Sequence, residues 1–141
     1  MIDIENIVVD HLSRKVSAAF PEATVYSERV EAPASLPCVV CVEDANTTYI
    51  RAQDNANAEH AADVVYTIEV YVANREGRKS EAKAILAVCD EAMLGMRFNR
   101  TMMTPVPSYD RTVYRIIARY RAVVGEPKTI DGNTVYQMYR S

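Results

Sequence analysis

The segment "RTVYRIIARYRAVV" (111–124) decides the fold, because its apolar residues alternate at the spacing of a β-strand. Successive side chains of a strand point to opposite faces of the sheet. One face is apolar and consists of Tyr114, Ile116, Ala118, Tyr120 and Ala122. The other mixes charged and apolar groups and consists of Val113, Arg115, Ile117, Arg119 and Arg121. We expect the first face to meet helices, whereas the second is too charged for a core.

The arginine-bearing face is also too apolar to be purely solvated, and such a mixture is typical of a surface that contacts another protein. The alternative is a solvated face that the aliphatic stems of the arginines cover. The segment "DVVYTIEVYVAN" (63–74) is the clearest second strand, and pairing with it would add Glu69 and Tyr71 to this face. Nine tyrosines and no tryptophan supply amphipathic contact area, and two of them lie in the tail. The predicted subunit interface therefore comprises Arg115, Ile117, Arg119, Arg121, Glu69, Tyr71, Tyr136 and Tyr139.

The remaining segments predict two helices and further strands. Apolar residues recur at helical spacing over 3–19, with Asp3 placed to cap the start, and over 79–94, with Gly95 at the position of the C-terminal cap. Strands are predicted at 23–30, 37–44 and 96–110, more weakly at 47–52, and in the tail after an Asp-Gly turn. The polar, alanine-rich segment 45–62 predicts a long loop that is poorly ordered in the free subunit and becomes ordered against a neighbour.

This order of elements predicts an α+β fold, in which a mixed, largely antiparallel sheet carries both helices on one face. The 141 residues suit a single domain spanning 1–141. Hydrophobic residues make up 49% of the chain and charged residues 25%, as in ordinary soluble proteins. The net charge of −3 argues against a protein whose whole surface binds nucleic acid. No apolar run approaches the roughly 20 residues of a membrane-spanning helix, so we expect no membrane partner and a cytosolic protein.

Residues with catalytic potential do not form a recognisable constellation in the sequence. His11 lies on the apolar side of the first predicted helix and His60 in the polar loop, and packed or exposed imidazoles are commoner there than general bases. The four glycines stand beside predicted helix ends or turns, so no phosphate-binding loop is expected. Four acidic residues could bind a cation if the fold gathers them, but scattered surface acids are the commoner outcome. They are Glu28, Glu31, Glu43 and Asp44. The sequence therefore predicts no enzyme, no cofactor and no metal.

The three cysteines are an odd number and fit a reducing compartment. Cys38 and Cys41 form a C-x-x-C in the predicted strand 37–44. A separation of three residues places their side chains on opposite faces and about 10 Å apart along the chain. We therefore interpret both as small buried residues instead of a redox pair or zinc ligands.

The second half of the chain resembles the tail-terminator proteins of long-tailed bacteriophages and the related head–tail joining proteins. The resemblance lies in a strand with a short basic turn, a helix containing "EAKAI", then "GMRFNRT", a "PVPSYD" turn and the strand "YRIIARYRA". The N-terminal helix, the "PCVV" strand and the loop up to residue 62 also fit this layout, so the resemblance spans nearly the whole chain. Its motifs are patterns of elements and not catalytic signatures.

The resemblance implies a non-enzymatic α+β subunit of the virion tail or neck that assembles in the host cytoplasm. Such proteins form a hexameric ring that caps the tail tube, stops its polymerisation and provides the surface that joins tail to head. The implied partners are other copies of the chain, the tail-tube protein, a head–tail connector or neck protein, and DNA that passes through the lumen without specific binding. We expect the arginine row to pair with acids of the adjacent subunit, which gives registry, instead of facing the DNA channel.

Two other functions fit the sequence. One is another neck, head-completion or tail-tube component of a phage or prophage. The other is an unrelated small bacterial binding module, which would need a deep pocket with converging polar groups.

Overall fold

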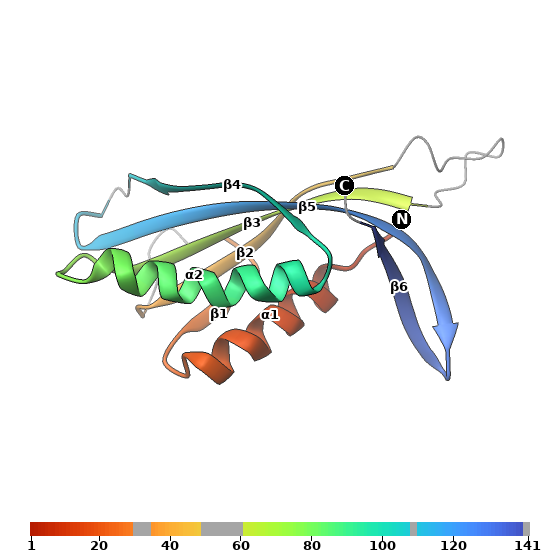
Figure 1. Ribbon diagram of the computed structural model, residues 1–141, viewed down its shortest axis with the longest axis horizontal. Coiled ribbons are helices and arrows are strands. Elements are labelled where there is room, and N and C mark those ends of the chain that lie inside the picture. Colours follow the sequence, from red (N-terminus) through yellow and green to blue (C-terminus); the bar gives the residue numbers. More distant parts are fainter. Residues whose placement is uncertain (30–34, 49–60, 108–109, 140–141) are drawn as a thin grey trace.

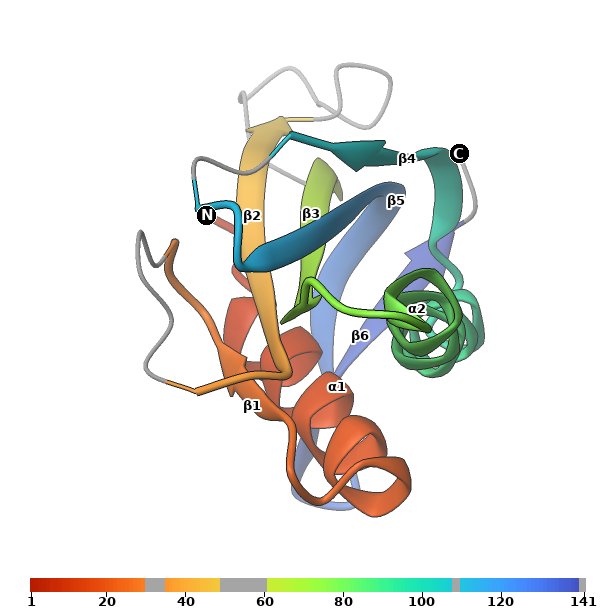
Figure 2. The same cartoon turned by 90° about the vertical axis from the view of Figure 1, so that its left-hand side faces the viewer.

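The computed structural model describes residues 1–29, 35–48, 61–107 and 110–139. Its elements follow in the order α1 (Glu5–Ala19), β1 (Thr24–Tyr26), β2 (Cys38–Thr48), β3 (Ala61–Ala73), α2 (Arg78–Gly95), β4 (Asn99–Val106), β5 (Val113–Ile130) and β6 (Asn133–Tyr139). The strands form one sheet in the order β1-β2-β3-β5-β4, with β6 also pairing with β5. Only β1 and β2 are parallel, and both helices lie on one face (Figures 1 and 2). The predicted α+β fold is confirmed.

The core lies between the helices and the apolar face of the sheet. Helix α1 buries Val8, Leu12 and Val16 at helical spacing, and α2 buries a similar stripe that includes Ile85 and Met93. The residues of β5 predicted to meet the helices do so, since Ile116, Ala118, Tyr120 and Ala122 belong to this buried cluster and Tyr114 packs against it. The alternation of apolar residues in this strand therefore predicted correctly which face of β5 meets the helices.

The long strand β5 organises the sheet. On one edge, β3 pairs antiparallel with β5 from Ala61↔Gly125 to Ala73↔Val113. On the other edge, β4 and β6 follow one another, β4 along residues 115–121 and β6 along residues 123–130. The outer part of β5 therefore forms a hairpin with β6 that extends past the end of β3 (Figure 1).

Several predicted boundaries differ from the structure. Strand β5 continues to Ile130 and not only to residue 124, because its outer half pairs with β6. Pro127 interrupts the register after Val124, as expected for a residue without an N–H donor. The Asp-Gly turn is confirmed: Asp131 and Gly132 have φ of 51° and 80°, so both central residues of the two-residue loop are left-handed.

Other corrections concern the ends of elements. Strand β1 covers only Thr24–Tyr26 of the predicted 23–30, and β4 covers Asn99–Val106 of 96–110. The left-handed residue after α2 is Arg97, with φ of 70°, and Gly95 is still helical. The N-cap residue of α1 is Ile4 and not Asp3 as predicted, although the Asp3 carboxylate accepts the N–H of Glu5 at 3.1 Å.

The predicted loop 45–62 is shorter than expected. Its first residues, 45–48, belong to β2, and its last two, 61 and 62, belong to β3, since these two strands pair out to Thr48↔Ala62. The remainder, 49–60, which includes most of the weak strand pattern and His60, lies outside the described residues. In the part of the chain that the structure describes, neither helix is long and apolar enough to cross a membrane.

Asp90 ties α2 to two strands. Its Oδ1 atom accepts hydrogen bonds from the buried Tyr120 hydroxyl of β5 at 2.8 Å and from Nη1 of Arg100 in β4 at 2.9 Å. Tyr120 is fully buried, so its hydroxyl has no access to water. One carboxylate therefore holds a helix, a central strand and an edge strand together.

Replacing Asp90 with alanine is expected to lower the free energy of unfolding by about 1–3 kcal/mol, because the Tyr120 hydroxyl is left buried without an acceptor. Asp90→Asn keeps an acceptor oxygen and should lose less. Urea unfolding of both variants measures the difference. Equal losses for the two variants, or no loss for alanine, would show that the Tyr120 hydrogen bond contributes nothing.

Candidate interaction surface

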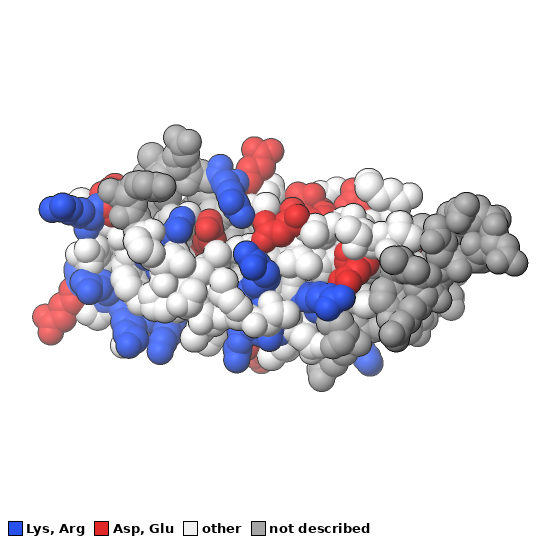
Figure 3. Space-filling view, turned by 90° about the horizontal axis from the view of Figure 1, so that it is seen from above, with Lys and Arg blue, Asp and Glu red and all other residues white. Residues whose placement is uncertain are grey.

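The face of the sheet opposite the helices carries Arg115, Arg119 and Arg121 of β5, and we call it the arginine face. The register of β3 against β5 places Tyr71 opposite Arg115, Glu69 opposite Ile117 and Thr67 opposite Arg119. Glu69 and Tyr71 therefore belong to this face, as predicted. Basic and acidic side chains lie interspersed across its middle (Figure 3).

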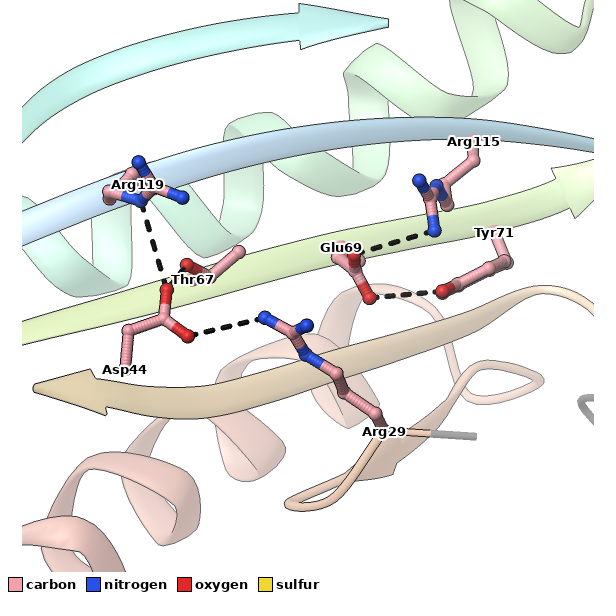
Figure 4. A network of polar contacts seen from close by, with 7 residues as sticks. All are labelled: Arg29, Asp44, Thr67, Glu69, Tyr71, Arg115 and Arg119. Atoms are coloured by element: carbon pink, nitrogen blue, oxygen red, sulfur yellow. Dashed lines mark hydrogen bonds and ion pairs between the residues drawn. The ribbon is translucent and has the colours of Figure 1, made fainter. Parts of the chain in front are cut away.

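Glu69 forms the centre of one polar cluster on this face. Its Oε2 atom accepts a hydrogen bond from the Tyr71 hydroxyl at 2.9 Å, and its Oε1 atom lies 3.6 Å from Nη1 of Arg115. The Arg115 guanidinium also lies over the Tyr71 ring, 5.9 Å from its centre. Glu69 is 6% exposed, and burial is the main reason that the pKa of Tyr71 is raised. The cluster is thus a buried polar patch that fixes the Arg115 side chain (Figure 4).

Asp44 of β2 forms the centre of a second cluster. Its Oδ1 atom lies 3.2 Å from Nη2 of Arg29, and its Oδ2 atom lies 3.7 Å from Nε of Arg119 and accepts the Thr67 hydroxyl hydrogen bond. Arg29 follows β1, so this carboxylate connects the segment after β1 with β3 and β5 (Figure 4). Pairs of this exposure contribute only about 0.2–1 kcal/mol each, but together they fix both arginine heads.

Arg121 is held by a third acid, Asp63 of β3. Its Nε atom donates to Oδ1 of Asp63 at 2.8 Å, and Nη2 donates to Oδ2, so the guanidinium and the carboxylate form a two-pronged pair. Such a pair fixes the plane of the guanidinium as well as its position. The Arg121 side chain is still 46% exposed.

The arginine row is therefore paired within the subunit. The predicted contact with acids of an adjacent subunit stays a prediction, whereas Glu69, Asp44 and Asp63 of the same chain pair with these arginines. The reason is the register: β2 and β3 present carboxylates directly beside β5. Four arginines meet three carboxylates here, so the charge of the face is nearly balanced.

The face still has the composition of a contact surface. Ile117 and Val123 of β5 are almost buried, and Val65 of β3 is half-buried. Thr104 of β4 lies opposite Ile117 and is exposed. Fixed arginine heads among these groups lose little conformational entropy when a partner binds.

Of the two tail tyrosines, Tyr136 does not extend this face as predicted. Tyr136 pairs with Pro127 and packs against the main core on the helix side of the sheet. The backbone of Tyr139 pairs with Val123, and its side chain lies outside the described part of the structure. Tyr136 is thus better explained as a residue that anchors the β5–β6 hairpin.

A second surface feature is an open hollow of about 850 Å³ along α1, next to Met96. It contains His11, whose pKa is lowered by burial and by the nearby Lys15 and Arg14. Arg14 in turn pairs with Asp10 at 2.9 Å. His11 is therefore a half-buried residue of the helix surface.

The three cysteines lie in two clusters, Cys38 on the arginine side of the sheet and Cys41 and Cys89 in the main core. Cys38 faces the arginine side of β2 and Cys41 faces the main core, so the predicted opposite orientation is confirmed. All three are free thiols. Burial raises the pKa of Cys38 to about 11 and those of Cys41 and Cys89 to about 12.

We expect the native protein to react with Ellman's reagent at none of its three thiols within minutes at about pH 8, because the thiolate is the reactive form and burial suppresses it. After addition of denaturant, all three thiols should react in a single phase. Fast reaction of one or two thiols in the native state would contradict the burial of β2 and α2.

Among the described residues, the acids that we considered for a cation, Glu28, Glu43 and Asp44, do not gather as a group. Asp44 faces Arg29 and Arg119, Glu28 is exposed, and Glu31 lies outside the described residues. Glu43 instead lies beside Asp3 and Glu5, which are far from it in the sequence. Only the register of β2 against β3 and the position of α1 bring these three together.

Comparison with models of known protein families finds no match for this chain. Comparison with curated protein sequences finds none either.

Proposed function

We propose that this protein is a structural subunit that assembles into a hexameric ring, caps a phage tail tube and joins the tail to the head, without enzymatic activity. The observation that carries the proposal is the arginine face: a sheet face that keeps fixed, half-exposed arginines beside apolar residues. The order of elements that motivated the resemblance, with α2 between two strands of an α+β sheet, supports the same conclusion.

Assembly on this face follows from its chemistry. Ion pairs within the subunit hold Arg119 and Arg121, and both side chains remain nearly half exposed. A neighbour that supplies carbonyl oxygens or acids would gain charge-assisted hydrogen bonds. The apolar groups between the arginines would supply the hydrophobic part of the contact.

The pairing also suits a ring around DNA. Proteins bind DNA phosphates through lysine and arginine side chains, which displace the counterions of the DNA. An arginine that is already paired with a carboxylate attracts a phosphate less strongly. The nearly balanced charge of this face therefore favours contact with protein over retention of a passing DNA. Virion location and the tail-tube and neck partners belong to the same proposal.

Electron microscopy of negatively stained protein, with solution mass from light scattering, tests the proposal. We expect closed rings with the mass of a hexamer that do not lengthen with concentration. Long cylinders would identify a tube subunit instead. A monomer at every concentration would contradict the ring.

A further inference from the structure

Three carboxylates converge where the N-terminus of α1 meets β2. Asp3 precedes the helix, Glu5 is its first residue, and Glu43 belongs to β2. One oxygen atom from each lies within 4.8 Å of the others. These residues line a small hollow of about 270 Å³ together with Met1, Asp44, Ala45 and Asn46.

Two buried polar atoms adjoin this group. The Oε1 atom of Glu43 and the hydroxyl of Tyr66 are inaccessible to water and form no hydrogen bond of standard geometry, although the Tyr66 hydroxyl and the Asn46 amide both lie close enough to interact with the Glu43 carboxylate. Tyr66 is fully buried and lies directly opposite Glu43 in the β2–β3 register. After burial, the charges of Glu43, Cys41, Glu5 and Asp3 contribute to raising the pKa of Tyr66, so its hydroxyl faces this group.

The negative charge here has no basic partner among the described residues, since their ion pairs leave Asp3, Glu5 and Glu43 out. This differs from the arginine face, where every acid has an arginine. Hydrogen bonds hold the start of α1 against β2. Asp3 accepts the N–H of Glu5, and the Asn46 amide of β2 donates to the carbonyl of Ile2 at 2.7 Å. The carboxylates are thus held together despite their repulsion.

We propose that Asp3, Glu5 and Glu43 form a binding site for a hydrated divalent cation, with Ca²⁺ preferred over Mg²⁺. Ca²⁺ binds carboxylate oxygens at about 2.3–2.6 Å, so ligands on opposite sides of the ion lie roughly 5 Å apart. The three oxygens fit within that span. Mg²⁺ demands a tighter octahedron and gives up water reluctantly, which an open site with three carboxylates does not compensate.

The site has a structural consequence that is independent of ring assembly. A bound ion would connect the start of α1 with β2, and its remaining ligands would be water. With only three protein ligands, the dissociation constant should lie at about 10⁻⁴ to 10⁻³ M, the range of weak calcium sites.

Terbium luminescence tests the site, because Tb³⁺ replaces Ca²⁺ at oxygen sites and is sensitised by a nearby tyrosine ring such as that of Tyr66. We expect saturable emission that Ca²⁺ displaces at lower concentration than Mg²⁺. Glu43→Gln should weaken binding at least about tenfold, which corresponds to one lost charged ligand. Glu28→Gln, an exposed acid outside the group, should bind as the unmodified protein does.

Circular dichroism checks that Glu43→Gln is folded, and Glu5→Gln on the first turn of α1 gives a second variant with less effect on the core. Ca²⁺ should also raise the melting temperature of the unmodified protein and of Glu28→Gln, but not that of the two site variants. Absence of displaceable terbium emission, or unchanged binding in folded Glu43→Gln and Glu5→Gln, would overturn the proposal. Equal displacement by Mg²⁺ would overturn the stated preference.

Discussion

Phe98→Ala is expected to lower the free energy of unfolding by about 3–5 kcal/mol, the usual cost of removing a fully buried phenylalanine. Phe98 is 0% exposed and lies between α2 and β4. Its ring meets that of Tyr66 edge to face, with the ring centres 5.5 Å apart. The substitution removes this contact and leaves a cavity in the core between the helices and the sheet. Because a domain of this size has only about 5–15 kcal/mol of stability, the variant should be close to unfolding.

The second phenylalanine provides the matched control. Phe20 ends α1, is only half-buried and packs against the edge of the same core. Phe20→Ala removes the same atoms and should cost less than half as much. Urea unfolding followed by circular dichroism compares the two variants. Equal losses would show that the core is not centred on the junction between α2 and β4.

The second large effect concerns assembly, and we expect Thr104→Glu to prevent ring formation while the monomer stays folded. Thr104 is exposed on the arginine face opposite Ile117, so its replacement should change monomer stability by no more than about 0.5 kcal/mol. In a subunit contact, however, the new carboxylate would be buried where the neighbouring subunit has no cation placed to pair with it. We expect at least about a tenfold weaker association at each contact, and a closed ring repeats that contact around its circumference.

The choice of Thr104 follows from the ion pairs of this face. Arg119→Glu would place a carboxylate beside Asp44, so it would disturb the fold and the interface together. Ala84→Glu, on the exposed surface of α2, introduces the same charge on the opposite side of the molecule and serves as the control. Light scattering should find monomers for Thr104→Glu and rings for Ala84→Glu. The reverse result would place the subunit contact on the helices.

The sequence alone predicts those features that depend on local periodicity. Alternation assigned the side chains of 113–122 to the correct faces, and the Asp-Gly pair located the β5–β6 turn, because both signals are contained in a few neighbouring residues. The continuation of β5 to Ile130 was not predictable in this way, since a proline and polar residues become a strand only through pairing with β6.

The partners of the arginines depend on register, which periodicity does not determine. Asp44 lies beside Arg119 only because β2 and β5 flank β3 with a particular offset, and an irregularity between Glu43 and Ala45 sets the position of Asp44. Strand alternation places Glu43 on the side of α1 and Asp44 on the arginine face. The acidic pairs and the carboxylate group are therefore products of the tertiary fold.

The central claim is that the arginine face is covered by a second copy of the chain. Arginine labelling with phenylglyoxal, read by mass spectrometry, tests it most directly when the assembled protein is compared with monomeric Thr104→Glu. We expect Arg119 and Arg121 to be protected in the assembly relative to the monomer, while Arg14, 73% exposed on α1, reacts equally in both. Equal labelling of Arg119 and Arg121 in the two states would contradict the account.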